Sequence, residues 1–223
     1  MAGKRKKGRA TLTKERVFET AVDLADEDGV EALTMRKLAR ELGVEAMSLY
    51  HHVADKEAIL DGMVECVFRE IELSEGLEWK SAMRARAGAL RDVLVKHRWA
   101  VSLLDSRRNP GEATLKHQDW VLGCLYDAGF SVALAASAAA TLDSYIYGFA
   151  MQEVSLPFNT PEEVEEVVTA MLEHLPAEIY PNLTRMARDH VMKPGYSFAK
   201  EFSFGLELTL DGLDKARTAG RRR

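Results

Sequence analysis

The chain has 223 residues, of which 47% are hydrophobic and 29% charged, and its formal net charge is −5. These proportions are ordinary for a globular protein, and the length suits one large domain or two small ones. No run of 18 apolar residues is present, which argues against a membrane span, and the basic N-terminus lacks the apolar stretch of a secretory signal. The two cysteines, Cys66 and Cys124, are expected to be reduced core residues of a cytoplasmic protein.

Charge is unevenly distributed along the chain. Residues 1–16 contain seven Lys or Arg and a single acidic residue, Glu15, whereas the chain beyond residue 56 is acidic overall. We expect residues 1–11 to form a disordered basic arm. Such an arm either meets a polyanion such as a nucleic acid or merely keeps the protein in solution, and charge alone does not decide between the two.

The apolar periodicity is helical throughout and strand-like alternation is absent, so we predict an all-α protein. The break at 74–78 divides a first domain, 12–73, from a larger second domain, 79–217, followed by a disordered tail at 218–223. The expected helices span 13–28, 34–42, 45–52, 55–73, 79–104 (as one or two helices), 112–128, 132–153, a segment opening at 160, and 197–215. The expected N-terminal caps are Thr13, Thr34, Asp55 and Thr160, with Gly29 and Gly43 as C-terminal stops.

Residues 38–46, LARELGVEA, have the pattern of a helix-turn-helix. The small Ala39 allows two helices to approach closely, and Gly43 supplies the positive φ that a sharp turn needs. Val44 and Leu49 fill the angle between the helices. In such a motif the second helix enters the major groove of DNA.

Three polar residues at the end of this motif, Tyr50, His51 and His52, remain outside the expected core. They can donate hydrogen bonds to phosphate oxygens, which fix the register of a protein on DNA. Lys56 adds a cation beside the free N–H groups at the start of the next helix. Ordinary surface residues are the alternative, and a metal site at His51 and His52 is disfavoured because adjacent helical residues diverge by about 100°.

The N-terminal 60 residues resemble the DNA-binding domain of the TetR family of bacterial regulators. The residues concerned are Leu33–Ala39, Gly43, Val44, Ser48–Tyr50, His52, Val53 and Lys56. The resemblance implies a homodimer that binds a palindromic operator on double-stranded DNA and is released by a small-molecule inducer. It also implies a set of DNA-binding residues, of which Arg36, Ala46, Met47 and Ser48 face bases, Thr34, Tyr50, His51, His52 and Lys56 hold phosphates, and Lys37 completes the set.

The C-terminal part is similar to the tetracycline repressor branch of this family, at Trp79, Arg84, Ala87, His97, Arg98, 129–131, Gly148, 204–208, Gly212 and Leu213. In that branch the drug arrives as a magnesium chelate held by histidines, but this chain has 102–105 (SLLD), Ser144 and Gln152 at the corresponding positions. We therefore expect no metal and no cofactor, although Asp105 or Glu153 could offer oxygen ligands. The resemblance implies a rather apolar pocket lined by Arg86, Leu90, Leu104, Val121, Ser144 and Gln152.

The family pairs two helices of each subunit in a four-helix bundle. By resemblance, the dimer interface would contain Ala135, Ala136, Ala139, Phe202, Leu206 and Leu210; the alternative is that these residues form plain core. A second hypothesis for function is an all-α small-molecule-binding protein or enzyme with an incidental basic arm. It requires a catalytic constellation, and His117, Asp119 and Cys124 do not share one helical face, so we expect no enzyme.

Overall fold

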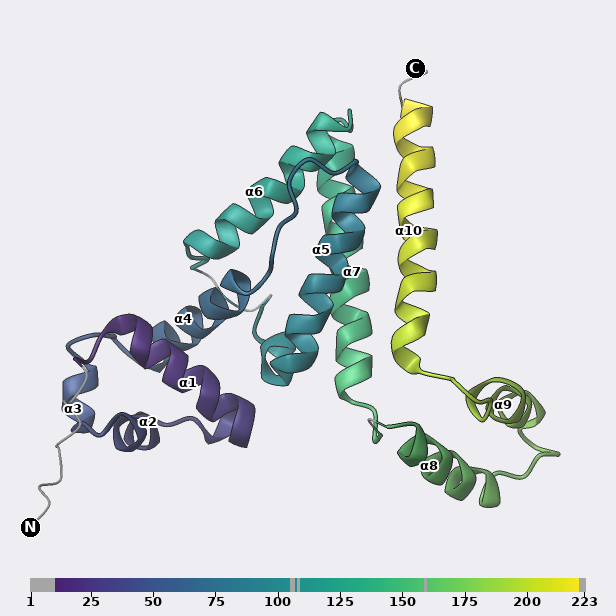
Figure 1. Cartoon of the computed structure of the whole chain (residues 1–223), viewed down its shortest axis with the longest axis horizontal. Coiled ribbons are helices and arrows are strands. Elements are labelled where there is room, and N and C mark those ends of the chain that lie inside the picture. The colour runs from purple at the N-terminus through teal and green to yellow at the C-terminus, as the bar shows by residue number, and fades with distance from the viewer. Residues whose placement is uncertain (1–10, 105–106, 108, 159, 221–223) are drawn as a thin grey trace, which may run out of the picture. The chain divides into compact units, whose positions relative to one another are not determined.

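The computed structural model describes residues 11–104, 107, 109–158 and 160–220, and these ranges contain helices but no strand (Figure 1). The all-α prediction is confirmed. The α-helices are α1 (Lys14–Asp28), α2 (Met35–Leu42), α3 (Ala46–Leu49), α4 (Lys56–Arg69), α5 (Trp79–Lys96), α6 (Glu112–Asp127), α7 (Val132–Val154), α8 (Pro161–Glu173), α9 (Pro181–Met186) and α10 (Phe198–Gly220). Two short 3₁₀ segments, η1 (Val30–Ala32) and η2 (Arg98–Ser102), and a π-helical turn, η4 (Ala187–Val191), complete the described elements.

The helices begin where the sequence places caps. The side chains of Thr13, Thr34 and Asp55 accept hydrogen bonds from backbone N–H groups three residues further on, at 3.2, 3.2 and 2.8 Å. Thr160 and Glu163 form the predicted reciprocal capping box. Because a cap of this kind contributes about 1 kcal/mol, local chemistry fixes these four helix starts.

Four segments differ from the prediction. Helix α4 ends at Arg69 and not at residue 73. Helix α3 ends at Leu49, and the chain continues as a turn in which the Val53 N–H still bonds to the Leu49 carbonyl. Helix α10 continues to Gly220, so 218–220 are helical and not part of a tail, while 1–10 and 221–223 lie outside the described residues. Helix α9 and the η4 turn were not predicted from the sequence.

The chain divides into two compact units. The first combines the chain up to Leu73 with Asp92–Trp120, and the second combines Ser74–Arg91 with Val121–Arg223. The segment 92–120, which was assigned to the second domain, therefore packs with the N-terminal helices. Helices α5 and α6 each contribute residues to both units.

In the first unit, α1 packs against α4. Gly62 allows this close approach, because a Cβ atom there would lie 2.3 Å from ring carbons of Phe18. The core around this contact is apolar and includes Val17, Ala21, Leu38, Leu49 and Met63. Since α2 packs on α1 and α3 packs on α2, the α1–α4 pair is the scaffold that holds α3.

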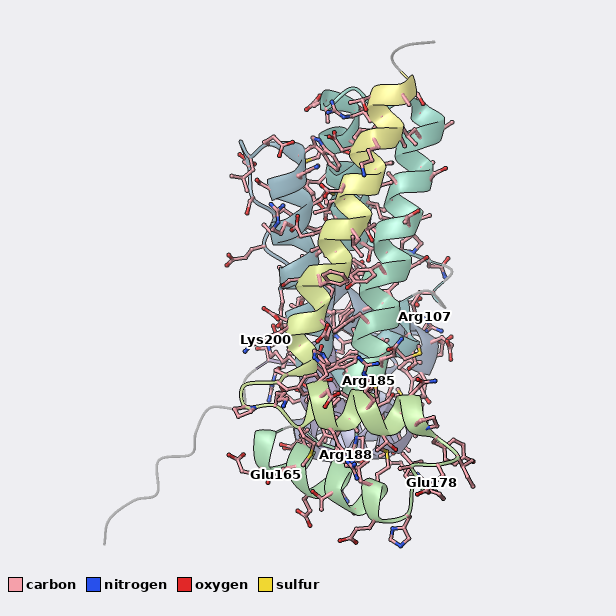
Figure 2. The ribbon with its side chains drawn as sticks, turned by 90° about the vertical axis from the view of Figure 1, so that its right-hand side faces the viewer. Arg107, Glu165, Glu178, Arg185, Arg188 and Lys200 are labelled. Carbon is pink, nitrogen blue, oxygen red and sulfur yellow. The ribbon has the colours of Figure 1, made fainter. Side chains whose placement is uncertain are left out.

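In the second unit, α7 and α10 lie side by side (Figures 1 and 2). The Tyr145 ring stacks on Phe202 with centroids 5.5 Å apart, and its hydroxyl donates to the Phe202 carbonyl at 2.7 Å. Gly205 leaves room for this tyrosine, since a Cβ there would lie 2.4 Å from the Tyr145 oxygen. The aromatic contact fixes the register of the two helices.

Candidate nucleic-acid interface

The α2–turn–α3 segment has the geometry of a helix-turn-helix. Gly43 adopts the left-handed conformation with φ +67°, and the Val44 N–H bonds to the Ala39 carbonyl at 2.9 Å. Leu38 and Leu49 are fully buried. The turn therefore holds α3 on the unit with one face buried and the other exposed.

The outer face of α3 is formed by large side chains that the core does not use. Met47 is 72% exposed and Tyr50 is 47% exposed. His51 is exposed as well, whereas Ala46, Ser48 and His52 are half-buried. A large apolar side chain so exposed on a DNA-reading helix can contact thymine methyl groups, and the tyrosine hydroxyl can bond to phosphate.

The predicted contacts from α2 and α4 have different surroundings. The side chains of Arg36 and Lys56 are exposed. Within the described residues, neither side chain forms an ion pair that would compete with DNA. Lys37, by contrast, forms an ion pair with Asp28 at 2.5 Å, so a phosphate contact would compete with that carboxylate. The hydroxyl of Thr34 accepts the Lys37 N–H and keeps its own proton free to donate.

The predicted pocket residues are distributed over both units. Arg86, Leu90 and Val121 are buried in the second unit, where Ser144 and Gln152 are exposed on α7. Leu104 belongs to the first unit, where it lines a cavity of about 180 Å³. Five of the six predicted pocket residues thus lie in the second unit, and Leu104 lies in the first.

Two partly buried ion pairs in the second unit were not predicted from the sequence. The Arg86 guanidinium donates to Asp143 at 2.5 Å, and Arg91 pairs with Glu153, with one contact at 2.7 Å. Asp143 is the only charged residue between 132 and 152. A single charge in such an apolar segment indicates that it needs a cationic partner, because an unpaired buried charge is costly. Glu153 is engaged by Arg91, and Asp105 lies outside the described residues.

The residues predicted for the dimer interface divide into two groups. Ala135, Phe202, Leu206 and Leu210 are buried within the single chain. Ala136 is exposed and Ala139 half-buried. The large apolar side chains left exposed on α10 are Phe204, at 68%, and Leu208, at 60%.

The described residues form neither a cluster of metal ligands nor a membrane span. No group of three or more His, Cys, Asp or Glu in these ranges is arranged to hold a metal ion. Within the same ranges, no helix is both long and apolar enough to cross a membrane.

The fold and the α2–α3 geometry define a helix-turn-helix DNA-binding protein. The sequence model described as "Bacterial regulatory proteins, tetR family" matches residues 17–63, and that of "Tetracyclin repressor-like, C-terminal domain" matches 74–217. The chain therefore belongs to the TetR family, and it is a DNA-binding transcription regulator.

Curated relatives agree with this assignment. The chain is 33% identical over 215 residues to the "HTH-type transcriptional repressor DrrR1" of Streptomyces coeruleorubidus, covering 92% of this chain and 78% of the relative. It is 37% identical over 147 residues to an "HTH-type transcriptional regulator" of Saccharopolyspora erythraea, covering 65% of this chain and 62% of that relative's length.

Solved structures are similar as well. The TetR family protein ActR of Streptomyces coelicolor, in complex with actinorhodin, superposes with a TM-score of 0.76 at 27% identity, covering 93% of this chain and 99% of that one. BioQ, solved with its double-stranded DNA operator, gives a TM-score of 0.65 at 25% identity, covering 91% and 98%.

Proposed function

We propose that this regulator is a repressor that binds a palindromic operator as a homodimer and is released by a small-molecule inducer. The observation that carries the proposal is the exposed outer face of α3, with Met47 and Tyr50 unburied on a helix whose inner residue Leu49 is fully buried. Arg36 and Ser48 supply polar contacts to base edges, and Met47 supplies an apolar one. Tyr50, His51, His52 and Lys56 hold phosphates.

The exposed residues of the paired helices support dimerisation. Phe204 and Leu208 are four residues apart on α10 and share one exposed face. A second copy would bury them, and Ala136 on α7 would allow the helices to approach closely. A symmetric pair presents two α3 helices to half-sites about one helical turn apart, roughly 34–36 Å.

The inducer site belongs to the second unit, around Leu90 and the Arg86–Asp143 pair. The relative crystallised with actinorhodin supports a small-molecule ligand for this fold. Because the histidines of the magnesium-dependent branch are replaced, the ligand needs no metal. Release of the operator by the inducer in the presence of EDTA is the expected outcome, and a magnesium requirement would contradict it.

The first test is to recover genomic DNA fragments with the purified protein at moderate salt and to sequence them. A shared palindrome supports the proposal, and the genes beside it indicate which compounds to test as inducers. Fragments without a common sequence would contradict the proposal, because they would indicate that the protein binds only phosphates, without sequence preference.

The phosphate contacts are tested by titrating the recovered operator over a range of salt. Lys56→Ala should weaken binding and lower the slope of log affinity against log salt by about 1, because one counterion fewer is released. The matched control is Lys116→Ala on α6, an exposed cation of the same unit paired with Glu112. An unchanged slope for Lys56→Ala rejects the role given to that residue.

A further inference from the structure

A polar cluster around a buried histidine lies in the first unit, outside the helix-turn-helix. We call it the His97 node; it comprises Asp26 of α1, Glu70 directly after α4, His97 directly after α5, and Trp99 of η2. His97 is only 1% exposed. A polar ring so deeply buried costs stability unless its nitrogens are hydrogen-bonded, so the contacts around it decide its role.

Both ring nitrogens of His97 face carboxylates. Its Nδ1 lies 2.8 and 2.9 Å from the two oxygens of Asp26, and its Nε2 lies 3.2 Å from Glu70 Oε1. Trp99 Nε1 also donates to Asp26, at 2.6 Å. An ionised carboxylate only accepts hydrogen bonds, so both contacts are made when each ring nitrogen carries a proton. The imidazole then bridges α1 to the end of α4.

Glu70 accepts a further hydrogen bond. Lys96 Nζ donates to Glu70 Oε2 at 2.6 Å, so this carboxylate contacts both Lys96 and His97. Burial by itself would raise the pKa of Glu70, but the hydrogen bonds from Lys96 and His97 outweigh it, and the pKa is lowered. The environment therefore favours the ionised carboxylate that the bridge requires.

The node adds a second, polar attachment between α1 and α4 to their apolar packing, which includes the contact of Phe18 with Gly62. Asp26 lies eight residues beyond Phe18, and Glu70 lies eight residues beyond Gly62. Eight residues correspond to about 12 Å of helix, which is enough separation for the second contact to fix the crossing angle.

We infer that His97, held by Asp26 and Glu70, is a positioning residue for DNA binding. It fixes the angle between α1 and α4, and thereby the placement of α3, and it ties that angle to the last turn of α5. This inference rests on the operator binding proposed above. Glu70, His97 and Trp99 lie beyond the matched DNA-binding segment, 17–63.

The test uses full-length Asp26→Asn, His97→Gln and the double variant. Each is measured for affinity to the recovered operator, for affinity to an unrelated duplex of equal length, and for thermal unfolding. Trp99→Phe is a milder variant that removes one donor and keeps a ring. The matched control is Glu112→Gln, which removes an exposed carboxylate of the same unit.

Each single variant should lose about tenfold in operator affinity, the equivalent of one charge-assisted hydrogen bond. Affinity for the unrelated duplex should stay unchanged, because the phosphate-binding side chains remain. The double variant should lose less than the product of the two single losses, since two amides can bond to each other. The control should bind as the unmodified protein does.

Unchanged operator affinity in both single variants overturns the inference. So does an equal loss on both duplexes that follows the drop in melting temperature, because that describes stability alone. If the unmodified protein binds all DNA sequences equally well, the proposal of operator binding fails. Amide hydrogen exchange then tests whether the node holds α1 in place. Asp26→Asn should then speed exchange in α1 and 96–102 but not in α10, and unchanged exchange rejects the node.

Discussion

Single side chains in this protein meet charged partners from distant parts of the sequence. Lys80 of α5 pairs with Asp211 of α10, and Arg84 pairs with Glu207 of the same helix through two hydrogen bonds at 2.5 and 2.9 Å. These pairs are exposed, so solvent screens them and each contributes little to stability. The Arg86–Asp143 pair differs, because the Arg86 side chain is buried and only the Asp143 side chain, at 33% exposed, reaches solvent, so solvent and salt screen this pair less.

The loss of folding stability at acid pH should depend on Glu70. Its pKa is lower in the folded protein than the ordinary value of 4.5, so the folded state binds the proton less readily than the unfolded state. The resulting stability is complete above about pH 4.5 and is lost as the pH falls through the lowered pKa. Thermal unfolding between pH 3 and 7 should show a shallower acid decline for Glu70→Gln. An acid decline of the same steepness would contradict the assignment.

Both thiols should react slowly in the folded protein. Burial raises the pKa of Cys66 and of Cys124 above the ordinary value of 9.0, which leaves little of the reactive thiolate at neutral pH. Labelling by an aromatic disulfide at pH 7 should therefore be slow and should accelerate when denaturant unfolds the chain. Labelling of native protein at the denatured rate would show that the thiols are accessible.

At the scale of elements, helix ends follow local rules, whereas contacts between helices depend on single small residues that allow close approach. Thr34 and Gly43 bound α2 as the sequence predicts, because a cap and a positive φ are properties of a few adjacent residues. The contact of α1 with α4 depends on Gly62, which no local rule identifies. Helix α9 and η4 were missed because Pro181 at a helix start is a weak signal without the packing that supports it.

Gly62→Ala should destabilise the protein by about 1–3 kcal/mol, because the new methyl group meets the Phe18 ring. Denaturant unfolding gives the free energy. The matched control is Gly88→Ala in α5, where a Cβ meets no atom within 4 Å. There the change should stabilise by about 0.5–1 kcal/mol, since alanine is the better helix former. Equal effects at the two positions would refute the close α1–α4 approach.

At the scale of the whole molecule, the apolar side chains that remain exposed indicate assembly. Helix α10 has apolar residues on two faces: Phe202, Leu206 and Leu210 point into the chain, and Phe204 and Leu208 point out of it. A helix that is apolar on both sides is normally covered on both sides. This pattern supports the homodimer.

Phe204→Glu and Leu208→Glu should each convert the dimer to monomer, because a carboxylate would be buried at the interface without a partner. Sedimentation equilibrium measures the mass. Leu115→Glu on α6 is the control, since it places the same charge at another exposed leucine. If both α10 variants keep the mass of the unmodified protein, the interface lies elsewhere; if that protein is itself a monomer, the dimer proposal fails.

The sequence by itself determined the all-α class, most helix starts, the helix-turn-helix and the family. Each depends on residues close together in the chain, where caps, glycines and the 3.6-residue period act. Only the tertiary structure decided which apolar face of α10 is core, and that His97 meets Asp26 and Glu70, 71 and 27 residues away. Hydrophobic periodicity defines the apolar face of a helix without specifying what covers that face. The partner of a buried polar residue is set only when the helices pack against one another.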